Sequence, residues 1–173
     1  MGLKPVLRIG ILTVSDRSAR GERPDLSGPA IEKEVVAQGW KIGKQEIIPD
    51  DLSILKSTLA AWADSDELDV LLTTGGTGFS PRDVTPEATN AVVERVALGL
   101  AEVMRASSLK VTPHAMLSRA TAGIRRKTLI VNLPGSPRAA VENLRVILPV
   151  LKHAVELLSD DPQAEAGHRD IDS

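Results

Sequence analysis

The sequence predicts an α/β fold with a mostly parallel central sheet and helices on both of its faces. Segments typical of strands alternate along the chain with segments typical of helices. The early strand candidates are continuous apolar runs, which indicates strands that are buried on both sides. The chain has 173 residues, 42% of them apolar, so its length and composition suit one domain with a sizeable buried core.

Four strands are expected from short runs of apolar and β-branched residues. The first run is followed by a polar segment, 15–25, which is expected to be a loop because it contains Gly21 and Pro24. Pro49 ends the second run. The expected strands cover residues 6–14, 41–48, 69–73 and 128–132.

Helix signals fill the intervals between these strands. Ser27 and Thr85 stand where helix-capping residues are expected, and a proline follows each of them within the first turn. Pro137 and Pro149 are each expected to open a helix near the end of the chain. The expected helices cover residues 27–38, 53–64, 85–96, 98–109, 137–146 and 149–158.

The folded domain is expected to cover residues 1–158. Residues 159–173 have little apolar content and are expected to form a flexible tail. The N-terminus is too short and too polar for a signal peptide, and no apolar run approaches the length of a membrane span. We therefore predict a cytoplasmic protein without a membrane partner.

The composition disfavours several classes of function. Lysine plus arginine is 21 and aspartate plus glutamate is 23; this balance and an aromatic content of 2% argue against a nucleic-acid partner. The absence of cysteine excludes disulfides, thiolate zinc sites and cysteine nucleophiles. The three histidines lie far apart in sequence, so neither a histidine metal site nor a Ser-His-Asp triad is supported.

The most informative segment is TTGGTGFSPRDVTPEAT, residues 73–89. Its glycines can adopt positive φ without strain, and successive N–H groups in such a loop can form a nest for an anion such as a phosphate ester. The alternative is a tight strand-to-helix turn that needs glycine only for its geometry. The spacing matches neither the P-loop nor the dinucleotide-binding signature. The candidate phosphate ligands are Gly75, Gly76 and Gly78, with hydroxyl donors from Thr74, Thr77 and Ser80.

Two aspartates change the interpretation of this loop. Asp83 follows the glycines, and Asp50 lies in the connection after the second expected strand. In a parallel sheet these connections, together with 15–17 and 133–136, meet at one edge. Two carboxylates repel a triphosphate, whereas Mg²⁺ binds carboxylate and phosphate oxygens together, so the pair indicates a metal-nucleotide site. The alternative is that both aspartates stabilise turns.

Four arginines are candidates for contacts with phosphate groups, and the sequence divides them into two kinds. Ser118 and Arg119 are expected to line a pocket. A solvated turn after Gly123 is the expected place of the two arginines at 125 and 126. The four candidates are Arg82, Arg119, Arg125 and Arg126.

Residues 73–89 resemble the signature of the molybdopterin adenylyltransferase family of the MogA type, which is related to MoaB proteins and to gephyrin G domains. Five further segments resemble family blocks in the family order, so the resemblance covers about residues 7–158. These segments are VSDR (14–17), IIPDD (47–51), MRASSLK (104–110), TPHAMLSRATAGIR (112–125) and LIVNLPGSP (129–137).

The resemblance implies a three-layer α/β/α fold, assembly as a homotrimer, and a reaction. The family transfers AMP from Mg-ATP to the terminal phosphate of molybdopterin, which gives adenylyl-molybdopterin and pyrophosphate. ATP would be the co-substrate and Mg²⁺ the cofactor, and hand-over of the product to a molybdate-insertion protein is expected. Such phosphate chemistry needs positioning and charge stabilisation rather than a histidine or a cysteine.

The resemblance also implies roles for individual residues. Asp50 and Asp83 would be the catalytic carboxylates, with Asp50 the candidate ligand of Mg²⁺. The nucleotide and its phosphates would be held by Thr74, Gly75, Gly76, Thr77, Gly78, Pro134 and Gly135. Molybdopterin would be bound by Asp83, Ser108, Ser118 and Arg119.

Two alternatives stay open at this point. A MoaB-type protein would keep the fold and bind molybdopterin without adenylating it, although PDD at 49–51 and RDVTPEAT at 82–89 match the active branch. An interaction module like the gephyrin G domain is the alternative of another class, although no fused second domain or long linker is expected. A generic phosphate binder rests on the glycine loop alone.

Overall fold

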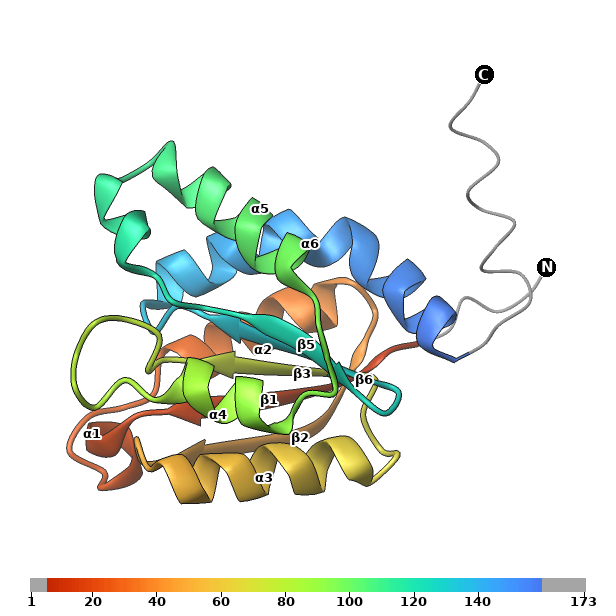
Figure 1. Cartoon of the computed structure of the whole chain (residues 1–173), viewed down its shortest axis with the longest axis horizontal. Helices are drawn as coiled ribbons and strands as arrows, with labels where there is room; N and C mark the ends of the chain where they lie inside the picture. The colour runs from red at the N-terminus through yellow and green to blue at the C-terminus, as the bar shows by residue number, and fades with distance from the viewer. Residues whose placement is uncertain (1–5, 160–173) are drawn as a thin grey trace.

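The computed structural model describes residues 6–159 and places six strands in one sheet of order β2-β1-β3-β6-β5-β4 (Figure 1). The strands are β1 (Arg8–Val14), β2 (Lys41–Ile48), β3 (Val70–Thr74), β4 (Arg95–Val96), β5 (Ala122–Arg125) and β6 (Thr128–Leu133). β1, β2, β3 and β6 run parallel, whereas the pairs β5–β6 and β4–β5 are antiparallel. The prediction of a mostly parallel sheet is confirmed.

Helices cover both faces of the sheet, which gives the expected three layers (Figure 1). One face carries α2 (Ser27–Ala37), α5 (Leu98–Leu109) and α6 (Pro137–Leu158). The other face carries α3 (Leu52–Asp64) and α4 (Thr85–Val92). Two short elements lie in connections, α1 (Asp16–Ala19) and the 3₁₀ helix η1 (Pro113–Leu117).

Each face of the sheet has its own apolar core. On the first face, side chains of α2 and α6 such as Ile31 and Leu144 pack with strand residues such as Leu72. On the second face, Leu59 of α3 packs in the same way with Leu71 of β3. Because β3 contributes neighbouring residues to both cores, its sequence is a continuous apolar run.

The edge strand β2 has a different composition for a physical reason. Its sequence, KIGKQEII, contains four polar or charged residues among its eight, and Ile48 is its one buried residue. β2 has a neighbour on one side only, so most of its side chains meet solvent. The prediction of a strand at 41–48 is correct, but continuous burial of the early strands holds for β1 and β3 rather than for β2.

Three predicted connections are wrong in detail. The loop expected at 15–25 contains the one-turn helix α1, because the hydroxyl of Ser15 accepts a hydrogen bond from the Ser18 N–H. The helix expected through 96 ends at Val92, after which the chain enters β4. The solvated turn expected after Gly123 is occupied by β5, and the turn itself lies at Arg126, which has φ of 51°.

The two helices expected at 137–146 and 149–158 form the single helix α6 of 22 residues. Pro149 lies inside it and is exposed. The buried residues Leu144, Ile147 and Leu151 follow one helical stripe across the proline. Burial of this stripe outweighs the loss of one backbone hydrogen bond at Pro149.

The two predicted capping residues are both helical residues instead. Ser27 is the first residue of α2, and the carboxylate of Asp25 accepts from the N–H groups of Ser27 and Gly28. The hydroxyl of Thr85 donates to the Gly75 carbonyl at 2.9 Å and so ties α4 to the glycine loop.

The expected tail, 159–173, lies outside the described residues beyond Ser159. In the described range, 6–159, none of the helices combines the length and the apolar character that crossing a membrane requires.

Candidate functional site: two cavities that share a glycine loop

Four connections meet at the carboxyl edge of the parallel strands, as predicted. They contain Ser15, Asp50, Gly75 and Gly135, one in each. Backbone hydrogen bonds join them in pairs. The N–H of Ser15 donates to the Ile48 carbonyl at 2.9 Å, and the N–H of Gly75 donates to the Leu133 carbonyl at 3.3 Å. The sheet therefore brings segments together that are far apart in sequence.

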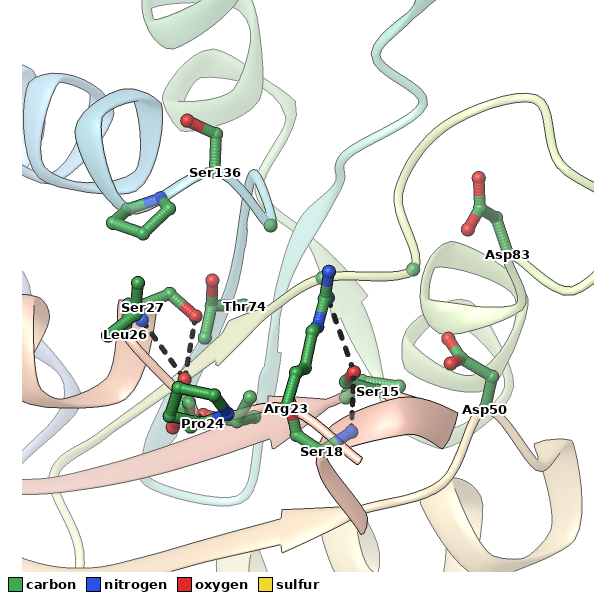
Figure 2. A pocket seen from close by; sticks show the side chains of 17 residues that line it. Ser15, Ser18, Arg23, Pro24, Leu26, Ser27, Asp50, Thr74, Asp83 and Ser136 are labelled. Atoms are coloured by element: carbon green, nitrogen blue, oxygen red, sulfur yellow. Dashed lines mark hydrogen bonds between the residues drawn. The ribbon is translucent and has the colours of Figure 1, made fainter. Parts of the chain in front are cut away.

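A first cavity of about 460 Å³ lies at this edge and combines hydroxyls, carboxylates and bare glycine backbone (Figure 2). Its lining includes six residues that were predicted for the site, namely Asp50, Thr74, Gly75, Gly76, Asp83 and Gly135. The other lining residues are Thr13, Val14, Ser15, Ser18, Arg23, Pro24, Asp25, Leu26, Ser27, Ser136 and Pro137.

The glycine loop requires glycine at two successive positions. Gly75 has φ of 100°, and a Cβ there would lie 2.3 Å from the carbonyl oxygen of Val14. Gly76 has φ of 64°, and a Cβ there would lie 2.4 Å from Thr85 Oγ1 and 3.1 Å from Asp50 Oδ1. Since no side chain fits, the loop presents its backbone to the cavity.

The same loop leaves N–H donors unused. The carbonyls of Gly76, Thr77 and Gly78 accept from the Thr85 N–H (3.1 Å), the Arg119 N–H (2.8 Å) and Arg119 Nε (2.7 Å). Across residues 6–159, the N–H groups of those three loop residues find no protein acceptor. Successive unused N–H groups of this kind form a nest that binds anions.

A hydrogen-bonded network holds Asp50 in place. Its Oδ2 accepts from the Asp16 N–H at 2.8 Å, and its own N–H donates to Asp16 Oδ1 at 3.1 Å. The carboxylate of Asp16 is in turn held by Arg82, through Nε to Oδ2 at 3.0 Å and through Nη2 to Oδ1 at 2.9 Å. The cation of this network therefore pairs with Asp16 and not with Asp50.

Burial and like charge both raise the pKa of Asp50. Desolvation of this half-buried carboxyl is the main cause, and repulsion from Asp16 and Asp83 adds to it. Burial also acts to raise the pKa of Asp16, but the hydrogen bonds from Arg82 and from the Asp50 N–H outweigh it and lower that pKa. Figure 2 shows Asp50 and Asp83 on the same side of the cavity. Two neighbouring carboxylates without their own cations suit a divalent ion.

A second cavity of about 280 Å³ borders the same loop. Five predicted site residues line it, namely Thr77, Gly78, Ser108, Ser118 and Pro134. Its apolar walls come from Val111, Ala115, Leu117 and Ala139. Its further polar residues are Arg105, Thr112, His114, Glu142 and Asn143. The expected nucleotide ligands Thr77, Gly78 and Pro134 thus lie with expected molybdopterin ligands, whereas Asp83 lines the first cavity.

Two short turns form the wall between the cavities. Gly76 lines the first cavity and Thr77 the second, while Gly135 lines the first and Pro134 the second. The hydroxyl of Thr74 donates to the Pro134 carbonyl at 2.7 Å, which joins the two turns. Ligands in the two cavities would therefore approach each other at the glycine loop.

Comparison with known proteins agrees with this arrangement. Residues 10–153 match the family described as "Probable molybdopterin binding domain". The chain belongs to this family.

Members of this molybdopterin-binding family and solved structures resemble the chain over most of its length. A Helicobacter pylori (strain J99) protein named molybdopterin adenylyltransferase is 41% identical, with 88% of each chain covered. Gephyrin from Dictyostelium discoideum is 40% identical over 95% of this chain, but the chain spans only 24% of gephyrin. The crystal structure of the molybdopterin biosynthesis enzyme MoaB from Thermus thermophilus is 48% identical, with a TM-score of 0.85, and covers 91% of this chain and 99% of that one.

Arg119 lines neither cavity of this family member. Its guanidinium donates to the carbonyls of Gly78 and Asp83, each at 2.7 Å, and forms an ion pair with Glu87 of α4. The hydrogen bond from Arg119 lowers the pKa of Glu87. Arg119 was predicted to bind the same ligand as Ser108 and Ser118, but it does not line the second cavity with them. It holds the glycine loop from outside the cavities.

The other arginines predicted for phosphate contacts are also engaged elsewhere. Arg82 pairs with Asp16, as described. Arg125 lies in β5 and pairs with Asp64 of α3 through Nη2 at 2.6 Å, so the prediction of a solvated position for it is wrong. Arg126 is exposed and donates to the Asp64 carbonyl at 3.2 Å.

Sequence reasoning missed several residues that line the two cavities. Arg23 extends along the first cavity from the segment after β1, with Nη2 3.4 Å from Ser15 Oγ (Figure 2). Its place in a polar segment at the carboxyl edge was the available signal. In the second cavity, Arg105 and Asn143 were missed, because both stand in helices among ordinary helical neighbours.

Proposed function

We propose that this chain is a molybdopterin adenylyltransferase, which transfers AMP from ATP to the terminal phosphate of molybdopterin and releases pyrophosphate. The observation that carries this proposal is that two cavities of different chemistry share the glycine-loop wall. Two substrates that react through their phosphates need such an arrangement. The Helicobacter pylori relative of nearly the same span bears the name of this activity.

The nucleotide is assigned to the first cavity and molybdopterin to the second. The first cavity offers the N–H groups around Gly76 and the guanidinium of Arg23 to the phosphates of ATP. The second cavity has apolar walls from residues such as Val111 and Leu117, which suit the faces of a flat pterin ring. Hydroxyls of Ser108 and Ser118 are available to its polar edge.

The reaction forms a bond between a terminal phosphate oxygen of molybdopterin and the α-phosphorus of ATP. The bond from that phosphorus to the oxygen bridging to the β-phosphate breaks, and its electron pair leaves with pyrophosphate. Such a transfer depends on in-line placement and on stabilisation of the phosphate charge. The N–H groups of Gly76, Thr77 and Gly78 lie in the wall between the two ligands and serve that purpose.

The residues of the first cavity fit an Mg²⁺ ion that is shared with ATP. Asp50 and Asp83 line the cavity together, and the pKa of Asp50 is raised by burial first and by repulsion from Asp16 and Asp83 second. In the described part of the chain, no group of three or more His, Cys, Asp or Glu side chains is placed to hold a metal. Asp50 and Asp83 would therefore hold the ion with phosphate oxygens as further ligands. When bound, the ion neutralises negative charge on the transferred phosphate.

A direct product assay tests this function. Purified protein is incubated with molybdopterin, ATP and Mg²⁺, and adenylyl-molybdopterin is measured by mass spectrometry. Asp50→Asn is expected to reduce the rate by roughly 100-fold or more with the fold retained. Asp51→Asn is the matched control, because Asp51 is exposed and caps α3 by accepting from the Ile54 N–H, which asparagine does equally well. Full activity of Asp50→Asn would contradict its assignment.

A second candidate is a MoaB-type protein that binds molybdopterin without adenylating it. The ground for this candidate is the name MoaB of the Thermus thermophilus structure, which is 48% identical and is described as a molybdopterin biosynthesis enzyme rather than as an adenylyltransferase. Binding of molybdopterin without product in the same assay would identify it. If neither binding nor product is found with folded protein, an interaction module of the gephyrin type becomes the better description.

Assembly as a homotrimer, hand-over to a molybdate-insertion protein and a cytoplasmic location stay predictions. Exposed apolar side chains at and near α5, including Val96, Leu98 and Val103, support an interface between copies. Light scattering should give three times the 18.4 kDa of one chain if the trimer forms.

A further inference from the structure

We propose that Asn143 fixes the hydroxyl of Ser108 as a hydrogen-bond donor to the ligand of the second cavity, and that this donor selects the 4-oxo group of the pterin ring. The inference rests on the proposed function, because it names the part of molybdopterin that this cavity recognises. It gives Asn143 a positioning role: the side chain acts by fixing the direction in which the hydroxyl of Ser108 donates.

The orientation of the Asn143 amide is set by its surroundings. Asn143 is only 5% exposed, and its Nδ2 lies 2.8 Å from the Ala139 carbonyl oxygen and 2.9 Å from Ser108 Oγ. A backbone carbonyl only accepts hydrogen bonds, so the amide nitrogen and not the amide oxygen must face Ala139. The second hydrogen of the same nitrogen is then directed to Ser108 Oγ, which is an acceptor in this pair.

This arrangement leaves the hydroxyl hydrogen of Ser108 for a ligand. A serine hydroxyl carries one hydrogen and can accept as well as donate. Since Ser108 Oγ accepts from Asn143, the hydrogen must point elsewhere, and within residues 6–159 Ser108 Oγ donates no hydrogen bond. Ser108 is half-buried and lines the cavity, so its hydroxyl is available there as a donor.

Two neighbouring side chains, Ser118 and Arg105, are also available as hydrogen-bond donors. The Oγ of Ser118 accepts from the Ala120 N–H at 3.4 Å, so its hydrogen also stays available. Arg105 has donors only, and its Nη1 is anchored to the carbonyls of Ser118 at 3.0 Å and Ala120 at 3.3 Å. No carboxylate of the described chain forms a salt bridge with Arg105.

The remaining polar groups of the cavity include hydrogen-bond acceptors. The carboxylate of Glu142 is engaged by Arg138 at 2.7 Å. The hydroxyl of Thr112 lies 3.2 Å from Nδ1 of His114. Oε2 of Glu142 and Oδ1 of Asn143 keep acceptor capacity, since neither oxygen receives a hydrogen bond within residues 6–159. The donors with spare capacity are Ser108, Ser118 and Arg105.

The groups of a pterin ring differ in hydrogen-bonding character. The 4-oxo oxygen accepts hydrogen bonds, whereas the neighbouring N3–H and the 2-amino group donate them. A set of fixed donors pairs with the 4-oxo oxygen and leaves a donor facing a donor when the 4-oxo group is replaced by an amino group. Such buried mismatches are strongly disfavoured, because neither group recovers the hydrogen bonds it made with water.

The test compares two pteridines that differ in this group. Binding of 6-hydroxymethylpterin and of 2,4-diamino-6-hydroxymethylpteridine is measured by fluorescence titration of the full chain. The wild type is expected to bind the 4-oxo compound roughly tenfold more tightly. Ser108→Ala should weaken binding of the 4-oxo compound by about fivefold and leave the 4-amino compound nearly unchanged. Asn143→Asp turns the partner of Ser108 into an acceptor, so the preference should fall towards equality.

Ser107→Ala is the matched control, because Ser107 precedes Ser108 in α5 but does not line this cavity. It should keep the wild-type preference, and ATP binding should be the same in all variants. Ser108→Ala decides the question even if Asn143→Asp fails to fold. Equal binding of the two pteridines by the wild type, no binding of either, or an unchanged preference in Ser108→Ala would each overturn the inference.

The adenylation assay separates this inference from the proposed function. A wild type that adenylates molybdopterin but does not discriminate between the pteridines keeps the function and loses the role of Asn143. A wild type that discriminates but forms no product supports the donor role of this cavity and contradicts the adenylyltransferase.

Discussion

Replacement of Gly76 by alanine should disrupt the wall between the two cavities, and the structure gives the size of the effect. Gly76 has φ of 64°, a left-handed conformation that costs a residue with a Cβ about 1 kcal/mol. The new Cβ would also lie 2.4 Å from Thr85 Oγ1. Thr85 is fully buried and donates to the Gly75 carbonyl, so its displacement costs a further ~1–3 kcal/mol.

Gly39→Ala separates these two contributions. Gly39 has a similar φ of 76°, but an added Cβ there meets nothing within 4 Å. Gly39→Ala should therefore lower the free energy of unfolding only by the conformational contribution, about 1 kcal/mol, and should keep full activity. Gly76→Ala should lose about 2–4 kcal/mol of unfolding free energy, which is roughly 4–16 °C in Tm, and most of its ATP affinity.

Urea unfolding of the two variants and the wild type gives the free energies, and titration calorimetry gives the ATP affinities. The comparison is sharp because the backbone conformations match, whereas only the Cβ added at Gly76 meets neighbours, chiefly Thr85 Oγ1 and then Asp50 Oδ1. If Gly76→Ala is no less stable than Gly39→Ala, or binds ATP as the wild type does, the steric account of the glycine loop is refuted.

Three further predictions follow from other parts of the molecule. Because the pKa of Asp50 is raised, its ionised form destabilises the fold, and its proton competes with Mg²⁺. Asp50→Asn should therefore stabilise the apoprotein at neutral pH. Unfolding curves should show that this gain vanishes at acidic pH, where Asp50 of the wild type is protonated. Arg119→Gln should lower kcat by about 10–100-fold through misplacement of the glycine loop, while Arg145→Gln, which breaks only the exposed pair with Glu34, should leave it unchanged in the same assay. Pro149→Ala should raise the unfolding free energy by about 1–2 kcal/mol, because it restores a backbone donor inside α6; urea unfolding that shows no gain would contradict this.

The parts of the fold that the sequence predicts are those with a strong local signal. β1, β3 and β6 are buried apolar runs between polar connections, and α5 begins and ends at the predicted residues. β4 and β5 have no such signal, because they are two and four residues long and exist through pairing with each other and with β6. The continuity of α6 across Pro149 likewise depends on tertiary burial of its apolar stripe, which local proline rules do not include.

For the candidate site, sequence reasoning identifies the residue types but not their division between the cavities. The glycines, Asp50 and Asp83 could be predicted as site residues, because bare backbone beside two carboxylates is more than a turn alone needs. Whether Gly76 and Thr77 face one cavity or two depends on the direction of the backbone at each residue, which composition does not specify. The roles of long side chains are harder to predict from the sequence, since the carboxylate partner of Arg119, Glu87, lies on another element.

The ion pairs that the arginines form explain why a metal ion suits this site. Arg82 pairs with Asp16 and Arg119 pairs with Glu87, so both guanidinium groups hold loops in position and are not available to a ligand. Within the described lining of the first cavity, Arg23 would face the phosphates of a bound nucleotide, whereas Asp50 and Asp83 would repel them. Each unit-charge repulsion at ~5 Å amounts to roughly 3 kcal/mol at an effective dielectric constant of about 20, which one exposed arginine and neutral N–H groups do not offset for a triphosphate. A divalent cation between carboxylates and phosphate reverses the sign of those interactions, and the loops that Arg82 and Arg119 hold in place keep the two carboxylates where such an ion would bind.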